Sequence, residues 1–317
     1  MAYGSLRLTA DVVVLINPES AGGRTRRRWP EIARALERAI GPFEHLFTEG
    51  PRHATSLARE AALAGSSLLV SVGGDGTHGE VVNGLLQLTA GAPSGASPAL
   101  GFVPSGTGDD LARSLGLPLD VDGAIARLAL RTERSVDAGR VSYTSDDGSP
   151  SARYFVNVAD FGLGGAVVLR VNRGGKVLPG KATFFVATVA AMLAWKNRAM
   201  RLVFDGGADA WEGSFREVVV ANGGTMGGGM VIAPDARMDD GQLEIVALGD
   251  LGLLSTLALA PAIYGGKPTR DPHVRRRRAR RLEAHAANGV PVAADGESLG
   301  RLPATFEALP AALRIRM

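Results

Sequence analysis

One arrangement recurs in the first third of the sequence and restricts the possible folds: a short apolar run, a glycine-rich turn, and then an amphipathic stretch. Val12–Ile16 is such a run, and after the turn that follows it apolar residues recur at helical spacing over 29–40. Residues 68–72 form a second run and 100–103 a third. Because strands that alternate with helices need crossover connections, this pattern predicts a parallel sheet covered by helices on both faces.

From residue 137 the pattern changes to short strand-like runs with turn residues between them, and the long helical crossovers disappear. This change predicts an antiparallel β-sandwich over 137–303, after a Rossmann-like α/β domain over 1–136 that strand 304–317 could complete. The runs in the second part predict strands at 153–158, 200–204, 217–221, 243–247, 280–284 and 290–293, with helices at 183–197 and 251–260.

Composition narrows the chemistry and the location. The 317 residues include no Cys, which excludes disulfides, thiolate metal sites and Cys nucleophiles. The net charge is only +3, but six of the seven residues 275–281 are Arg. A local basic patch suits anionic lipid headgroups better than general nucleic-acid binding; equally, a charged edge strand would prevent aggregation. The apolar stretch 182–195 is shorter than the roughly 20 residues that span a bilayer, so it does not predict a transmembrane helix. Together with the basic patch, this indicates a cytoplasmic protein at the inner membrane surface. A homodimer is left open as an alternative to a monomer.

The turn Gly-Gly-Asp-Gly-Thr at 73–77 joins a predicted buried strand to a helix, which places it at the carboxyl edge of the sheet where ligands bind. Glycines let the backbone approach a ligand, and the free N–H groups of a helix start favour phosphate. Asp75 would repel phosphate unless a cation lies between them, which indicates a nucleotide with Mg²⁺. A glycine turn with an Asp cap is the alternative. Similar turns at 17–24 and 104–107 favour the nucleotide.

A second acidic segment, Asp295-Gly296-Glu297, follows the predicted strand 290–293. An Asp-Gly pair after a strand is a strong hairpin signal, so a plain turn is one interpretation. The other is catalytic, because phosphoryl transfer to an alcohol needs a carboxylate that orients or deprotonates the hydroxyl. In that case Glu297 should face the glycine turns across a cleft between the two domains.

The three turns, together with residues 76–84, resemble the bacterial diacylglycerol kinase and lipid kinase family, which shares its catalytic domain with sphingosine kinases and, distantly, with NAD kinases. The resemblance covers nearly the whole chain. It implies ATP- and Mg²⁺-dependent transfer of the γ-phosphoryl group to a lipid hydroxyl, with diacylglycerol as the first expected acceptor and phosphatidic acid as product. The motifs that carry it are Asn17-Pro18, the Gly-Gly-Asp-Gly-Thr turn, the Pro-x-Gly-Thr segment at 104–107 with Asp110, Asp240-Gly241, and Asp295-Gly296-Glu297.

The resemblance also implies roles for single residues. Glu297 would accept the proton of the acceptor, while Asp75 and Asp295 would organise magnesium and water around the transferred group. A nucleotide would be contacted by Asn17, Pro18, Glu19, Ser20, Ala21, Arg24, Thr48, Gly73, Gly74, Asp75, Gly76, Thr77, His78, Gly79, Gly106 and Thr107.

A second, structural magnesium is implied at the Asp240 carboxylate and the backbone carbonyls of Arg237 and Gln242.

Other interpretations of the function stay open: a kinase for a sphingoid base or phosphatidylglycerol, an NAD-kinase-like enzyme, or a nucleotide-binding membrane-docking module without catalysis. The stretch 182–195, with Phe184 and Phe185, could line an acyl-binding wall or pack a core. The Gly-x-x-x-x-Gly-Lys spacing at 175–181 lacks the hydroxyl that a phosphate-binding loop needs next.

Overall fold

The computed structural model describes residues 11–89, 97–173, 180–207, 209–265, 271–287 and 289–317. The chain divides into two compact units. The first runs to Asp137 and takes in Ala311–Met317, and the second is Ala138–Pro310. The Gly-x-x-x-x-Gly-Lys segment lies mostly outside the described residues, as do the side chains of Phe184 and Phe185.

The first unit contains the parallel sheet that the repeated pattern predicts, and this part of the fold class is confirmed. Its strand order is β2-β1-β3-β4 followed by the end of β17, and each described pair is parallel. Strands buried on both faces read as continuous apolar runs, and β3 and β4 are buried at every position. The strands are β1 (Val12–Ile16), β2 (Glu44–Phe47), β3 (Leu68–Gly73), β4 (Ala99–Pro104) and β17 (Glu297–Arg316).

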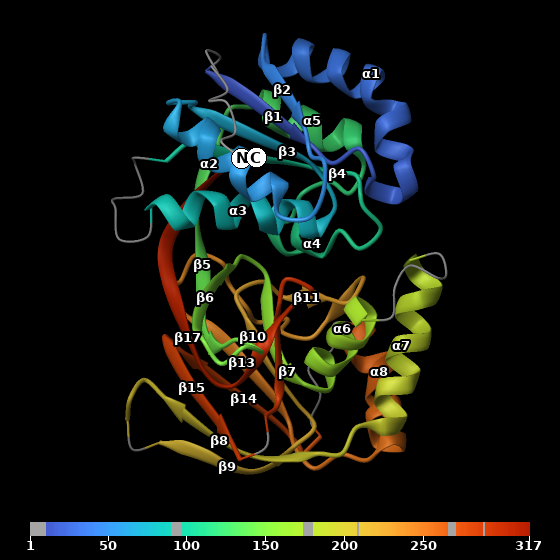
Figure 1. The fold of residues 1–317 in the computed structure, drawn as a ribbon, viewed down its shortest axis with the longest axis vertical. Helices are drawn as coiled ribbons and strands as arrows, with labels where there is room; N and C mark the ends of the chain where they lie inside the picture. The colour runs from blue at the N-terminus through green and yellow to red at the C-terminus, as the bar shows by residue number, and fades with distance from the viewer. Residues whose placement is uncertain (1–10, 90–96, 174–179, 208, 266–270, 288) are drawn as a thin grey trace. The chain divides into compact units, whose positions relative to one another are not determined.

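Helices cover both faces of this sheet (Figure 1). On one face α1 packs beside α5, and their apolar side chains share a core with alternate residues of the strands. In α1 these are Ile32, Leu36 and Ile40, each four positions apart on one side of the helix. On the other face α2 packs against α3. The helices are α1 (Ser20–Ile40), α2 (His53–Leu63), α3 (Asp75–Thr89), α4 (Asp110–Leu115) and α5 (Val121–Ala129).

The second unit is built on antiparallel strands, which confirms the other half of the predicted fold class. The order runs β14-β13-β10-β7-β16-β17-β15-β8-β9, and β5 joins β17 to β6. The strands are β5 (Glu133–Thr144), β6 (Pro150–Phe155), β7 (Val158–Gly162), β8 (Arg198–Phe204), β9 (Ala210–Phe215), β10 (Glu217–Ala221), β11 (Thr225–Met226), β12 (Met230–Val231), β13 (Leu243–Leu248), β14 (Val274–Ala279), β15 (Arg281–Ala286) and β16 (Pro291–Ala294).

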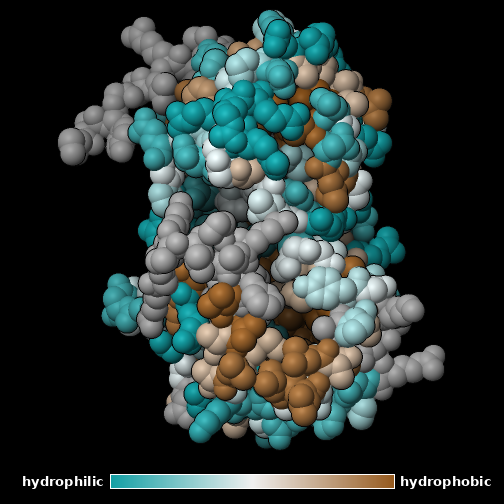
Figure 2. All heavy atoms as spheres, turned by 90° about the vertical axis from the view of Figure 1, so that its right-hand side faces the viewer, coloured by the Kyte–Doolittle hydropathy of each residue, from teal (hydrophilic) through white to brown (hydrophobic). Residues whose placement is uncertain are grey.

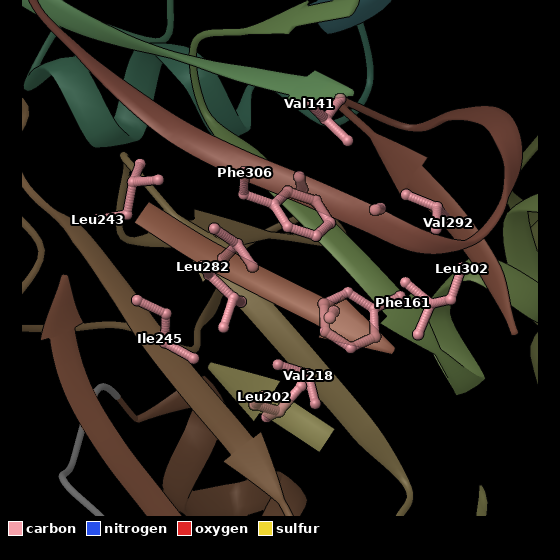
Figure 3. Packing of buried hydrophobic residues seen from close by; sticks show 14 of the residues in the cluster. Val141, Phe161, Leu202, Val218, Leu243, Ile245, Leu282, Val292, Leu302 and Phe306 are labelled. Carbon is pink, nitrogen blue, oxygen red and sulfur yellow. The ribbon is translucent and has the colours of Figure 1, made fainter. Parts of the chain in front are cut away.

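The largest apolar core of the second unit is shown in Figure 3, and the unit also contains two smaller apolar clusters. The rings of Phe161 and Phe306 stack with their centroids 5.4 Å apart, and Leu282 and Val218 are fully buried beside them. Three helices complete the unit: α6 (Leu163–Arg173), α7 (Gly180–Ala194) and α8 (Leu253–Tyr264).

The boundaries differ from the predicted ones in a few places. The single strand predicted at 153–158 is wrong, because the chain breaks after Phe155 and begins a new strand at Val158. Helix α8 begins and ends later than predicted. Strand β17 is 20 residues long and starts far before the predicted strand 304–317.

The arginine run lies on β14 and the start of β15. Most of its side chains have partners that lie close to them in the fold. Arg277 lies 3.2 Å from Asp209 and over the Phe204 ring, and Arg275 lies over the Trp211 ring. Within the described strand pairings, β14 is hydrogen-bonded only to β13 and stands at the end of the order. These contacts favour the interpretation as a charged edge strand.

Candidate active site

The turns that follow β1, β3 and β4 come together at the carboxyl edge of the sheet in the first unit. The Asn17 amide N–H donates to the Val72 carbonyl at 3.0 Å, and the Ser105 N–H donates to the Gly73 carbonyl at 2.7 Å. A side-chain bond adds to these, from Asn17 Nδ2 to Thr77 Oγ1 at 2.9 Å. The residues predicted to bind a nucleotide in these three turns therefore do lie side by side.

Two glycines allow the turns after β3 and β4 to touch. A Cβ atom added at Gly106 would lie 2.7 Å from the Gly74 Cα atom, closer than real Cβ atoms approach anything. A Cβ atom at Gly108 would likewise lie 2.7 Å from Asp75 Oδ2. The glycines at these positions are therefore required by close approach of backbone to backbone and of backbone to carboxylate.

The turn after β1 has an uncommon backbone. Ala21, Gly22 and Gly23 all have left-handed φ values, of 52°, 68° and 78°, inside the first turns of α1. An Ala in this region is strained, and such strain gathers at functional sites. The start of the helix is joined to the turn after β4 by a 2.6 Å bond between Thr25 Oγ1 and Ser105 Oγ, which the sequence did not reveal.

The Asp75 carboxylate is fixed by backbone N–H groups at the start of α4. Its two carboxylate oxygens accept the N–H groups of Asp110 at 3.2 Å and Leu111 at 3.1 Å. Burial and then the charge of Asp75 raise the pKa of Asp109, which has a left-handed φ of 57°. A backbone hydrogen bond from Gly106 and the charges of Arg113 and Arg24 act in the opposite direction. This edge thus carries fixed carboxylates that phosphate would meet only with a cation between them.

Two of the predicted nucleotide residues are placed differently from the rest. The His78 ring is buried, bonds Ser71 Oγ through Nδ1 at 2.8 Å and packs on Phe102. Its burial lowers the pKa to about 4. The side chain therefore faces the core, and only its backbone is left for a ligand. Thr48 is buried at the end of β2, and its N–H donates to Ile16 at 2.8 Å.

In the second unit, Asp295 and Gly296 form the two-residue connection between β16 and β17. Ala294 pairs with Glu297, and the two turn residues have φ values of 46° and 78°, as an Asp-Gly hairpin requires. The hairpin interpretation is therefore confirmed, and it is compatible with a catalytic role of the same segment.

The Asp295 carboxylate organises the backbone of a distant segment. It accepts the N–H groups of Val156 at 2.8 Å, Asn157 at 3.1 Å and Val158 at 3.0 Å. These bonds satisfy the backbone where β6 ends and β7 begins, which explains the break in the strand predicted there. Asp295 thus fixes the position of the turn that precedes Glu297.

Glu297 is ion-paired with Arg153 of β6, at 2.6 Å between Glu297 Oε2 and Arg153 Nη2. The Arg153 side chain is 15% exposed and that of Glu297 34%, so the carboxylate reaches solvent while its partner is mostly buried. No sequence motif indicates Arg153; the only local signal is a charged residue in an expected strand.

The residues predicted to hold a structural magnesium lie between β12 and β13. Asp240 Oδ1 accepts the Gln242 N–H at 3.0 Å, and Arg237 Nε lies 3.4 Å from Asp239 Oδ1. Across the described part of the chain, three or more His, Asp or Glu side chains nowhere gather as a metal site. Magnesium that binds together with a nucleotide is held by one or two carboxylates and by the phosphates. Asp75 therefore suits such an ion without a cluster of three acidic or histidine side chains.

Comparison with known proteins decides the family. Residues 11–141 match the family described as "Diacylglycerol kinase catalytic domain", and residues 157–317 match "YegS C-terminal NAD kinase beta sandwich-like domain". A protein of Pseudomonas aeruginosa (strain ATCC 15692) named "Probable lipid kinase YegS-like" is 32% identical over 268 residues, covering 83% of this chain and 81% of that protein. The chain belongs to this family of lipid kinases.

Further relatives of the lipid kinase span nearly its whole length. "Diacylglycerol kinase" of Bacillus subtilis (strain 168) is 27% identical over 294 residues, which is 92% of this chain and 91% of that one. The crystal structure of a diacylglycerol kinase from Bacillus anthracis str. Sterne has the same fold, with a TM-score of 0.72, 22% identity and 96% of both chains covered. Among the described helices, none combines the length and the apolar character needed to cross a bilayer.

Proposed function

We propose that this lipid kinase transfers the γ-phosphoryl group of ATP, bound with Mg²⁺, to a hydroxyl group of diacylglycerol, with phosphatidic acid as the product. The observation that carries the proposal is the convergence of three glycine turns beside the fixed Asp75 carboxylate. Backbone N–H groups at helix starts favour phosphates, and the carboxylate supplies a hard oxygen ligand for the cation that phosphates bring. Relatives named diacylglycerol kinase match about nine-tenths of the chain, which supports diacylglycerol as the acceptor.

In the proposed step, the lipid hydroxyl oxygen forms a bond to the γ-phosphorus while the bond from that phosphorus to the ADP oxygen breaks. The hydroxyl proton passes to the Glu297 carboxylate. Asp75 would hold the magnesium that accompanies the nucleotide, and that ion would supply positive charge to the phosphates. Arg153 holds the carboxylate through the 2.6 Å ion pair, and Asp295 fixes the turn that precedes Glu297. A base of this kind contributes typically about 10²- to 10⁴-fold in rate.

We further propose that the enzyme meets its lipid at a bilayer surface through α7 and α8. Exposed apolar side chains lie at helical spacing on both helices, and Figure 2 shows apolar side chains gathered on the side of the second unit where these helices lie. Lys196, exposed directly after α7, suits an anionic headgroup. The exposed apolar residues are Val186, Val189 and Leu193 of α7 and Leu254, Leu257 and Tyr264 of α8.

The deciding experiment incubates the purified protein with terminally labelled ATP, Mg²⁺ and a total lipid extract, and then identifies the labelled product. We expect label in phosphatidic acid, and its loss in Asp75→Ala. Glu297→Gln should lose turnover by about 10²-fold or more while ATP binding, measured by calorimetry, is nearly unchanged.

Label in another lipid would replace diacylglycerol as the acceptor and leave the reaction class intact. Label only in a soluble dinucleotide, or no transfer to any acceptor, would contradict the proposed reaction. Equal turnover in Glu297→Gln would remove Glu297 from the mechanism.

A further inference from the structure

Three oxygen atoms of the second unit lie around one positively charged side chain, the guanidinium group of Arg278. Arg278 of β14 lies opposite Glu244 of β13 in the antiparallel register, and its Nε lies 3.2 Å from Glu244 Oε2. Its Nη1 lies 3.5 Å from Asp240 Oδ2. Its Nη2 donates to the Asp235 carbonyl oxygen at 2.6 Å. One guanidinium group therefore meets two carboxylates and one carbonyl.

These oxygens need a positive charge. The Glu244 side chain is only 6% exposed and that of Asp240 19%, and a buried carboxylate is costly unless it is paired. Carboxylate and carbonyl oxygens are also the ligands that Mg²⁺ prefers. A planar guanidinium with five donors can reach three such atoms at once, which the point charge of a lysine cannot do as well.

The structural magnesium implied by the sequence motif does not fit this arrangement. Of the two Asp240 oxygens, Oδ1 accepts the Gln242 N–H and Oδ2 faces Arg278. The loop is further tied to the same strand by Arg276, whose Nη1 lies 3.5 Å from Asp235 Oδ2. Oδ1 thus has a backbone donor, and Oδ2 faces a guanidinium charge that would repel a second cation on the same carboxylate.

We propose that Arg278 is the fixed cation of this site, and that it faces the Asp240 carboxylate where the motif implied a magnesium held together with the carbonyls of Arg237 and Gln242. The loop between β12 and β13 is then held to the β14 edge without a divalent ion. The oxygens form a cation site in their own right, so that a divalent ion can enter when the guanidinium is removed. This inference does not depend on the proposed reaction, because it concerns the protein without nucleotide.

The first test uses the wild-type protein without nucleotide. Its magnesium content is measured by mass spectrometry after gel filtration, and its Tm is measured in EDTA and in Mg²⁺. We expect no stoichiometric magnesium and the same Tm in both solutions. One tightly bound magnesium per chain, whose removal lowers the Tm, would overturn the proposal.

The second test compares Arg278→Ala with Arg277→Ala, a control that makes the same change of charge on the same strand. Since Arg278→Ala leaves a buried carboxylate without its cation, we expect its Tm to fall by about 4 to 8 °C, more than in the control. Millimolar Mg²⁺ should restore part of that loss and should leave the control unchanged. Equal losses in the two variants, or no recovery with Mg²⁺, would overturn the proposal.

Should Arg278→Ala fail to fold, Arg278→Lys keeps the charge but not the planar fork. We expect its Tm to lie below that of the wild type, with no gain from Mg²⁺. A Tm equal to that of the wild type would show that the three-way contact is not needed, and the wild-type measurement stands in either case.

Discussion

Arg153 is the residue beside the expected base that no motif indicated. Its guanidinium holds the Glu297 carboxylate at 2.6 Å from a mostly buried position, so it fixes where that carboxylate points. We expect Arg153→Gln to lower kcat by about tenfold or more with a smaller change in the KM for ATP, because orientation of a catalytic group affects the chemical step.

Arg153→Lys retains the charge and should recover part of that kcat. Steady-state kinetics with separate kcat and KM values distinguish this role from a merely structural one. An unchanged kcat in Arg153→Gln, with the protein folded, would contradict it.

Two buried carboxyl groups of the second unit face each other at the start of α6. Burial raises the pKa of Asp160 from about 3.8 to about 7, and burial together with the Asp160 charge raises that of Glu217 well above its usual range. Glu217 Oε2 also accepts the Gly164 N–H at 2.5 Å. The native protein thus keeps protons here that the unfolded chain releases at lower pH.

The sign of the resulting pH dependence follows from this difference. Between about pH 4 and pH 7 these two carboxyl groups bind more protons in the native state than in the unfolded state, so the stability that they contribute falls as the pH rises. Asp160→Asn removes one of the protons and the charge beside Glu217, so its urea midpoint should fall less from pH 5 to pH 8. The exposed Asp122→Asn is the control. A variant that follows the wild-type pH profile would contradict this account.

Helices α7 and α8 are held by hydrogen bonds near their ends, while apolar side chains along them are exposed. The buried Arg216 guanidinium reaches the Met192 carbonyl at 3.4 Å and the Leu251 carbonyl at 3.4 Å. Leu193 and Leu254, by contrast, are 69% and 82% exposed. The helix ends are therefore fixed, while large apolar side chains are exposed to water on the surface that we propose meets the lipid.

Replacing both Leu193 and Leu254 with Ser should weaken sedimentation with anionic vesicles. Each leucine transferred from water is worth about 1.5 kcal/mol or more, so we expect about a tenfold loss per side chain. The control is Leu63→Ser on α2, where the leucine is 72% exposed. Vesicle binding that is equal in the double variant and the control would exclude these helices as the contact.

The elements that the sequence predicted well are those whose signal is local. The apolar runs and glycine turns of the first unit lie where the pattern indicated, because strand burial and turn conformation depend on near neighbours. The break between β6 and β7 could not be predicted, since it is stabilised by Asp295, 137 to 139 residues away. The same holds for the Arg153 and Arg278 contacts, which join residues far apart in the chain.

At the scale of the whole molecule, β17 connects the two units through the chain itself. Its last residues belong to the first unit, where Ile315 pairs with Leu100 and is fully buried. Ile315→Ala should lower the free energy of unfolding by about 2 to 5 kcal/mol. Hydrogen exchange should report faster opening of β4 in this variant than in Leu130→Ala, whose leucine is 60% exposed. Unchanged exchange in β4 would contradict this.

This return of the chain also affects how the protein is made. Domains usually fold in order as they leave the ribosome, the amino-terminal one first. Here the sheet of the earlier unit lacks its last strand until all of the later unit has been synthesised. A nascent chain stalled before residue 311 should therefore carry an unpaired β4 edge, and we expect such chains to depend on chaperones until translation has passed that point.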